Sequence, residues 1–191
     1  MRKWRAVLLL TAAGVGFAVS FVMLREAIGT DSPWLCLFLM FCILGMGKIA
    51  EPLFLLRMPG SLRPIRAWER SGTVYRGLGV KAFGRLLRST PLHDLNRQVY
   101  LSRQRADAQH VMRLVESAEA SHFWAALPLL PGIAITLATG QFLTATVLIL
   151  VQVFFNLYPI LHLRLVRERL GRYVVAAGRK RRFPAVGNVA A

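Results

Sequence analysis

Acidic residues are scarce in this chain of 191 residues: nine Asp and Glu stand against 25 Lys and Arg, a formal net charge of +16. Charge of either sign is also limited, since 18% of the residues are charged and 55% are hydrophobic. From Phe123 to Leu161 no residue carries a formal charge. Soluble domains carry about 25% charged residues. The composition therefore excludes an ordinary soluble domain and predicts an all-α integral membrane protein.

Cysteine is equally rare. Cys36 and Cys42 lie six residues apart within an apolar run, with no Cys-x-x-Cys pair and no histidine nearby. This spacing excludes a zinc site and a redox pair, and we expect two reduced packing residues.

Several catalytic signatures are missing. The chain has no Gly-x-Ser-x-Gly elbow, no Walker-type glycine loop and no His-Glu-x-x-His zinc motif. None of its four histidines begins the His-x-x-x-x-Asp pattern of glycerolipid acyltransferases, because positions 98, 115, 127 and 167 hold Gln, Val, Leu and Arg. We therefore expect neither a metal nor a nucleotide cofactor.

Four apolar runs predict transmembrane helices, because about 20 apolar residues cross the hydrocarbon core of a bilayer as a helix. They are residues 6–24, 33–56, 122–139 and 141–161. For the first run a cleaved signal peptide is the alternative, but its length and the lack of a small-x-small site before Arg25 favour a retained anchor. Only Gly140 separates the third and fourth runs, so they form an antiparallel hairpin. Pro128 and Pro131 are expected to kink the third.

The basic residues are concentrated in two segments. Twelve Lys and Arg lie within residues 57–120 and eight within residues 162–191, whereas none lies between the third and fourth runs. The positive-inside rule then places both termini and the segment 57–120 in the cytoplasm, with residues 1–191 forming a single domain of a multi-pass cell-membrane protein. Because the charge follows topology, anionic lipids are the expected partners and nucleic acid is not.

The segment 57–120 is predicted to consist of short helices, because several prolines interrupt it. One helix is expected at residues 64–71 with Gly72 as its stop, and another starts at Thr90-Pro91. A longer one is expected at residues 101–121, which carry an apolar stripe. We expect these amphipathic pieces to lie among the lipid headgroups.

Polar side chains gather near the predicted cytoplasmic ends of the helices. Glu119 and His122 are three residues apart, so they lie on one helix face. A hairpin turning at Gly140 places Tyr158 opposite His122 and Asn156 opposite Trp124.

Lys48 and Glu51 also stand three residues apart, in the second half of the second run. They form either a self-neutralising pair with Lys48 reaching toward the interface, or part of a polar site.

These groups suggest acyl-transfer chemistry. His122 can act as a general base oriented by Glu119, and Asn156 can donate hydrogen bonds to the developing oxyanion. The plainer alternatives are a solvated helix turn for Glu119 and His122, and a bond between helices for Asn156.

Substrate binding is expected from a second set of residues. Arg70, Arg76 or Arg85 can hold the phosphates of a donor. The full set predicted to bind substrate is Glu51, Arg70, Arg76, Tyr158 and His162.

Three motifs carry a resemblance to a known family: Trp68-Glu69-Arg70 with Gly72, Tyr75-Arg76 and Leu78-Gly79-Val80; Glu116-x-x-Glu119-x-x-His122-Phe-Trp124; and Asn156-Leu-Tyr158-Pro159 before a basic exit. Over about residues 45–172 the chain resembles the glycosyl-4,4'-diaponeurosporenoate acyltransferases. The resemblance implies a membrane acyltransferase that esterifies a sugar hydroxyl of a glycosylated carotenoid with a fatty acyl chain, with an acyl thioester as donor. It departs from the family at His162-Leu-Arg164, where a Gln-Arg pair is expected. The alternative is a non-catalytic membrane scaffold that binds anionic lipid or a partner through its basic segment.

Overall fold

The computed structural model describes residues 3–70, 72–90 and 108–182, and the regular structure in these ranges is helical, without strands. The chain divides into two compact units. The membrane unit comprises Met1–Pro64 and Glu116–Leu161, and the basic unit comprises Ile65–Val115 and His162–Ala191.

The membrane unit opens with an antiparallel helix pair. α1 (Lys3–Ile28) and α2 (Trp34–Ala50) are joined by a short turn at Gly29, whose φ of 85° belongs to the left-handed region that glycine adopts without strain. Pro33 occupies the N-cap of α2, as the sequence predicts for a helix start.

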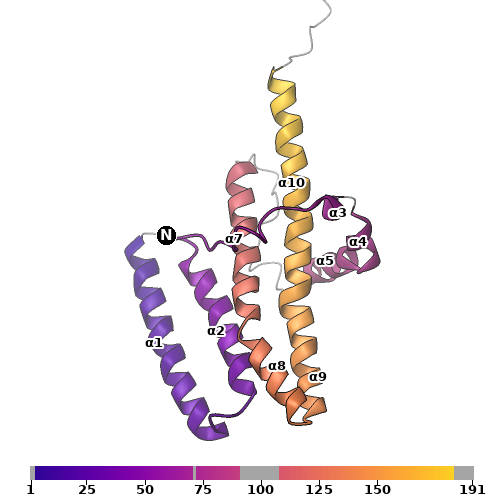
Figure 1. Cartoon of the computed structure of the whole chain (residues 1–191). Coiled ribbons are helices and arrows are strands. Elements are labelled where there is room, and N and C mark those ends of the chain that lie inside the picture. Colours follow the sequence, from indigo (N-terminus) through magenta and orange to yellow (C-terminus); the bar gives the residue numbers. More distant parts are fainter. Residues whose placement is uncertain (1–2, 71, 91–107, 183–191) are drawn as a thin grey trace, which may run out of the picture. The chain divides into compact units, whose positions relative to one another are not determined.

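A second antiparallel pair follows, α8 (Leu129–Ala138) and α9 (Phe142–Val151), and it turns at Gly140 with φ 72°. The predicted hairpin is confirmed. Both turns lie at the same end of the membrane unit, as Figure 1 shows.

The helix bounds differ from the predicted spans where proline intervenes. α2 has 17 residues and ends at Ala50 instead of position 56, because Pro52 lacks the N–H that a continuing helix needs. α7 (Ala108–Ala126) begins well before residue 122, and Pro128 caps α8, so the third span has an irregularity at Pro128, where a kink was expected, while Ala108–Ala138 remains one candidate span.

The fourth span is also irregular. α9 passes into a π-helical turn, η2 (Gln152–Leu157), and then into α10 (Tyr158–Arg182). In the described chain, three helices are long and apolar enough to span a bilayer: Lys3–Ile28, Ala108–Ala138 and Phe142–Val175. α2 is a shorter apolar helix, at the lower limit for a span. The predicted class, an all-α membrane protein, is confirmed.

Small residues bring the helices of the membrane unit together around a core of Met40, Ala125, Leu129 and Leu148. A Cβ atom on Gly132 would lie 3.1 Å from the Cys36 sulfur. Such close backbone approach drives helix association in lipid, where apolar burial alone gives little. Both cysteines are free thiols, and Cys36 packs against the core as predicted.

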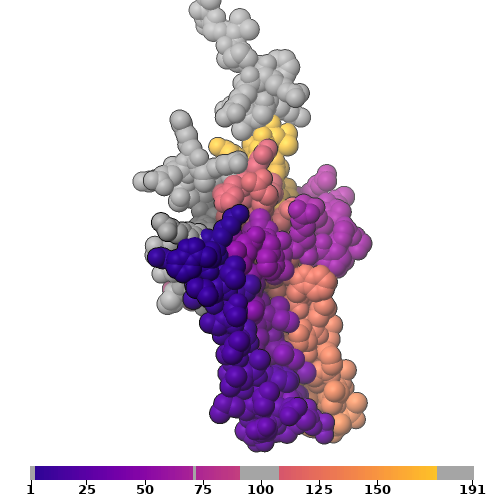
Figure 2. Space-filling model, turned by 90° about the vertical axis from the view of Figure 1, so that its left-hand side faces the viewer, coloured from indigo at the N-terminus to yellow at the C-terminus, as the bar shows by residue number. Residues whose placement is uncertain are grey.

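The outer surface of the membrane unit is apolar. Figure 2 shows α1, in indigo, along the face turned toward the viewer, and Val7, Leu8 and Leu9 of this helix are exposed. A patch of this kind marks contact with lipid or protein.

The basic unit is built from short helices and the continuation of α10 from His162. α3 (Ala67–Arg70), α4 (Thr73–Gly77) and α5 (Val80–Arg88) follow one another closely. Gly72, with φ 68°, donates its N–H to the Glu69 carbonyl at 3.2 Å, so the predicted glycine stop is confirmed although α3 begins at Ala67. Pro91 of the predicted helix start, residues 101–107 of the predicted next helix and the chain after residue 182 lie outside the described residues.

Candidate functional site

His122 of α7 reaches across to the π-helical turn. Its Nδ1 lies 2.8 Å from the main-chain carbonyl oxygen of Phe155. A carbonyl oxygen only accepts, so Nδ1 carries the proton and donates it, which leaves the lone pair on Nε2. The half-buried imidazole is thereby fixed in the tautomer whose Nε2 can take a proton.

A proline makes the Phe155 carbonyl available. In a regular α-helix this oxygen would accept from the N–H of residue 159, but Pro159 has none. The chain adopts the π-helical turn here, and Tyr158 donates its N–H to the Val153 carbonyl. Turns of this kind recur at functional sites. The sequence signal for this contact is Pro159, which closes the Asn156-Leu-Tyr158-Pro159 motif.

Asn156 is fully buried beside this contact. Its Nδ2 donates to Gln152 Oε1 at 2.8 Å and approaches the Met40 sulfur at 3.1 Å. Turning the amide by 180° brings its NH₂ group within 3.3 Å of the His122 carbonyl and 3.2 Å of the Phe155 carbonyl. In either orientation Asn156 bonds within the helix bundle, as the plainer alternative had it, and its role toward an oxyanion stays a prediction.

The hairpin register is displaced by three residues from the predicted one. His122 meets Phe155, where Tyr158 was expected, because the break at Pro128 and the π-helical turn both change the residue count between the facing positions. Tyr158 stacks on Phe154 instead, with ring centroids 6.0 Å apart.

The two carboxylates predicted for the site occupy different places in the membrane unit. Glu119 is fully buried one helical turn before His122. At Nδ1, however, the orienting group is the Phe155 carbonyl and not a carboxylate. Glu51 caps the end of α2 and forms an ion pair with Lys48, which matches the self-neutralising pair considered above.

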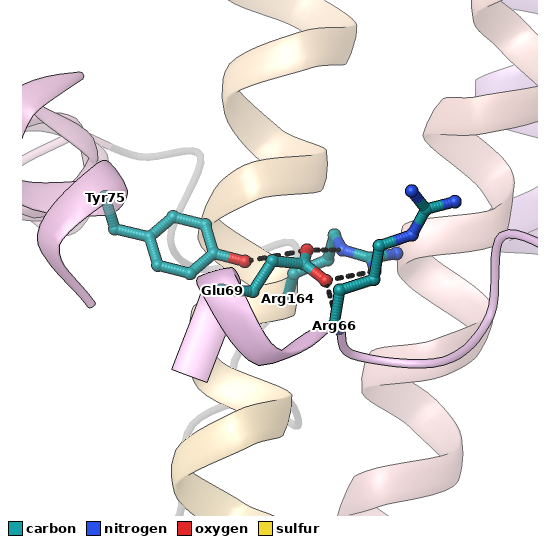
Figure 3. A network of polar contacts seen from close by, with 4 residues as sticks. All are labelled: Arg66, Glu69, Tyr75 and Arg164. Carbon is teal, nitrogen blue, oxygen red and sulfur yellow. Dashed lines mark hydrogen bonds and ion pairs between the residues drawn. The ribbon is translucent and has the colours of Figure 1, made fainter. Parts of the chain in front are cut away.

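The basic unit contains a buried network that the sequence alone did not single out (Figure 3). Glu69 of α3 is 2% exposed, and Arg164 of α10 binds it through Nε at 2.5 Å and Nη2 at 2.9 Å. The Tyr75 hydroxyl donates at 3.1 Å and the Arg66 main-chain N–H at 2.6 Å. This carboxylate therefore joins α3, α4 and α10.

Electrostatics keeps this network in one protonation state. Burial alone raises the pKa of Glu69, but hydrogen bonds from Arg164, Arg66 and Tyr75, together with the Arg164 charge, hold that pKa below its ordinary value. Burial and the neighbouring Glu69 charge raise the pKa of Tyr75, so its hydroxyl remains a donor.

A cavity of about 290 Å³ opens beside the network. Its lining includes five basic side chains: Arg70, Arg76, Lys81, Arg169 and Arg172. The structure thus brings together Arg70 and Arg76, both predicted to bind substrate, whereas Arg85 is not part of the lining among the described residues. Glu168 also lines the cavity and accepts from Arg172 at 2.8 Å.

His162 lies in packing and not in this cavity. It is 7% exposed, meets the Phe83 ring edge to face at 6.4 Å, and occupies the space left by the missing side chain of Gly84. The predicted site residues therefore fall into two sets. Glu51, Glu119, His122, Asn156 and Tyr158 belong to the membrane unit, and Arg70, Arg76 and His162 to the basic unit.

An all-helical membrane protein is the class that these features define. The chain belongs to the glycosyl-4,4'-diaponeurosporenoate acyltransferase family, whose profile matches residues 60–176, more than half of its length. No curated protein and no solved structure gives a significant match. The matched region includes all three motifs quoted above, so the resemblance is confirmed at the level of the family.

Proposed function

We propose that the protein is a membrane acyltransferase that esterifies a sugar hydroxyl of a lipid-soluble, glycosylated acceptor of the carotenoid type with a fatty acyl chain. Family membership supports the reaction class. The observation that carries the proposal is the His122 imidazole, whose Nδ1–H is held by the Phe155 carbonyl so that Nε2 is the basic nitrogen.

The reaction follows from that tautomer. Nε2 removes the proton from the sugar hydroxyl while the hydroxyl oxygen attacks the carbonyl carbon of an acyl thioester. The Phe155 carbonyl stabilises the imidazolium through the Nδ1–H bond. The tetrahedral intermediate then collapses, the C–S bond breaks, and the imidazolium returns its proton to the leaving thiolate. The products are an ester and a free thiol.

The remaining membrane-unit residues have supporting roles in this proposal. Glu119 lies one helical turn before His122, and Asn156 is the donor toward the oxyanion. Glu51 and Tyr158 bind the acceptor. The apolar outer surface admits the acceptor sideways from the bilayer, and no metal is required.

The basic residues define the orientation. We place the protein in the cell membrane with both termini in the cytoplasm, since the basic segments flank the spans on that side. The acyl donor then arrives from the cytoplasm, and anionic lipids neutralise part of the basic surface.

Profiling of lipids and pigments by mass spectrometry tests this function in a host that makes the glycosylated carotenoid. The wild-type chain is compared with His122→Ala at matched membrane levels. His110→Ala is the control, because this histidine is exposed on the same helix. We expect an acylated glycolipid from wild type and His110→Ala that disappears with His122→Ala.

Two other outcomes would count against parts of the proposal. Equal product from His122→Ala would discard the base and keep the transferase. No product from well-inserted wild type would favour the scaffold, particularly if neutralising several arginines alone disturbs the host.

A further inference from the structure

The cavity of the basic unit gathers like charges without matching counter-charges. Among the described residues, five cations line it and Glu168 is the one carboxylate, which already pairs with Arg172. Like charges that line one cavity repel each other. An anion bound between these cations would relieve their repulsion and so stabilise this arrangement.

The cations come from different segments. Arg70 lies at the end of α3, Arg76 in α4 and Lys81 in the first turn of α5, while Arg169 and Arg172 belong to α10. All five are exposed at the cavity and available to a ligand. The guanidinium fork suits phosphate oxygens, which it binds in pairs.

Buried neighbours fix the two arginines that lie on short helices. α3 has four residues and α4 has five, too few for a stable helix in isolation. Glu69 directly precedes Arg70 and Tyr75 directly precedes Arg76, and both buried residues belong to the network on Arg164. The network therefore fixes the main-chain positions from which the Arg70 and Arg76 side chains extend.

We propose that this cavity binds the phosphate groups of the acyl donor, a phosphate-bearing thioester of the coenzyme A type, and that Glu69, Tyr75 and Arg164 are positioning residues for Arg70 and Arg76. The identity of the donor rests on the proposed function. The binding of phosphate rests on the cation cluster alone. A phospholipid headgroup offers the same chemistry from the membrane.

The test uses the full chain in phosphatidylcholine nanodiscs. Equilibrium binding is measured with coenzyme A and with dephospho-coenzyme A, which lacks one phosphate. A second arm measures retention of phosphatidylglycerol when this lipid is mixed into the nanodiscs.

Matched variants identify the cavity. We expect Arg70→Gln and Arg76→Gln each to weaken coenzyme A binding about tenfold, since each removes a charge-assisted bond to phosphate. Arg85→Gln removes the same charge outside the cavity and should bind as wild type does. Dephospho-coenzyme A should bind more weakly than coenzyme A to wild type, with a smaller difference in the two cavity variants.

A positioning role has its own signature. Tyr75→Phe deletes one hydrogen bond and no charge, so coenzyme A binding should weaken about threefold while the salt dependence of binding stays that of wild type. Arg76→Gln should flatten that salt dependence.

The outcomes separate the hypotheses. The phosphate site is overturned if both cavity variants bind coenzyme A and retain phosphatidylglycerol as the wild type does, or if Arg85→Gln causes an equal loss. Losses confined to the phosphatidylglycerol arm support the phosphate site and assign it to a headgroup. If the cavity variants lose coenzyme A binding but the wild type never forms an ester, this inference stands and the proposed function is rejected. If the wild type forms the ester but both cavity variants bind coenzyme A as the wild type does, the proposed function stands and the cavity is not the donor site.

Discussion

The Nδ1–H of His122 donates to the main-chain carbonyl of Phe155 at 2.8 Å, and the residue whose N–H would bind this carbonyl in a regular α-helix is Pro159, which has none. A main-chain carbonyl cannot take up the proton, unlike a carboxylate partner. The tautomer is therefore set by backbone geometry, and it depends on the π-helical turn.

Restoring the missing N–H should disturb the imidazole. In Pro159→Ala the new N–H at position 159 competes for the Phe155 carbonyl, so ester formation should fall by about tenfold or more. Product yield per inserted protein measures this. Pro131→Ala is the control. Pro131 lies in the first turn of α8, where a main-chain N–H has no partner within the helix, so adding one should leave the product yield unchanged. Equal yields from both variants would remove the carbonyl from the mechanism.

The packing of His162 on α5 gives a stability prediction. A Cβ atom on Gly84 would lie 2.5 Å from His162 Cε1, so Gly84→Ala forces the ring to move and should destabilise the protein by about 1–3 kcal/mol. Gly77→Ala is the matched control, since its Cβ meets nothing within 4 Å. Thermal unfolding in detergent compares them, and an unshifted transition for Gly84→Ala would contradict the packing.

The buried carboxylate predicts an acid limb in the stability of the basic unit. Because the pKa of Glu69 is held below its ordinary value of 4.5, the network stabilises the fold above that pH and loses this contribution as the pH falls through the lowered pKa. Unfolding followed from about pH 7 to about pH 3 measures the loss.

Glu69→Gln should remove this part of the acid limb, and should itself cost about 3–5 kcal/mol near neutral pH because Arg164 is left buried without its carboxylate. An acid limb of unchanged size in the variant would show that other carboxylates cause it.

Topology can be read by labelling single cysteines. In a chain with Cys36→Ala and Cys42→Ala, a membrane-impermeant maleimide applied to intact cells should label Gln141→Cys in the hairpin turn. It should label Ser89→Cys only after lysis, since the positive-inside rule places this segment in the cytoplasm. The opposite pattern would invert the proposed orientation.

The parts of the fold that composition controls were predictable. Apolar runs predict the helices of the membrane unit, and single glycines predict the turn at Gly140 and the stop at Gly72. The proline positions predict irregularities but not their size: Pro52 ends α2 at Ala50, and Pro128 separates α7 from α8 within the third span. Each of these effects changes the register of the residues that follow, which sequence spacing cannot report.

The site was predictable only in its side chains. His122 is predictable from its place at the start of an apolar run, but its partner is a main-chain carbonyl that every residue carries, and Pro159 is the one sequence signal that points to it. The Glu69 network could not be predicted for another reason: its ion pair joins Glu69 and Arg164, which are 95 residues apart in the chain. The sequence does not distinguish Arg85 from Arg76, and only the folding of α4 and α5 places Arg76 in the cavity lining and leaves Arg85 out of it.

The 95 residues between Glu69 and Arg164 also determine the order in which the network can form during synthesis. Chains emerge from the ribosome with the N-terminus first, so α3 and α4 leave the ribosome before Arg164, the partner of Glu69, is synthesised. Neither helix is long enough to persist alone. The cavity lined by the five cations is consequently among the last features of the protein to form, and a chain truncated before α10 would lack Arg164, which holds α3 and α4 in place.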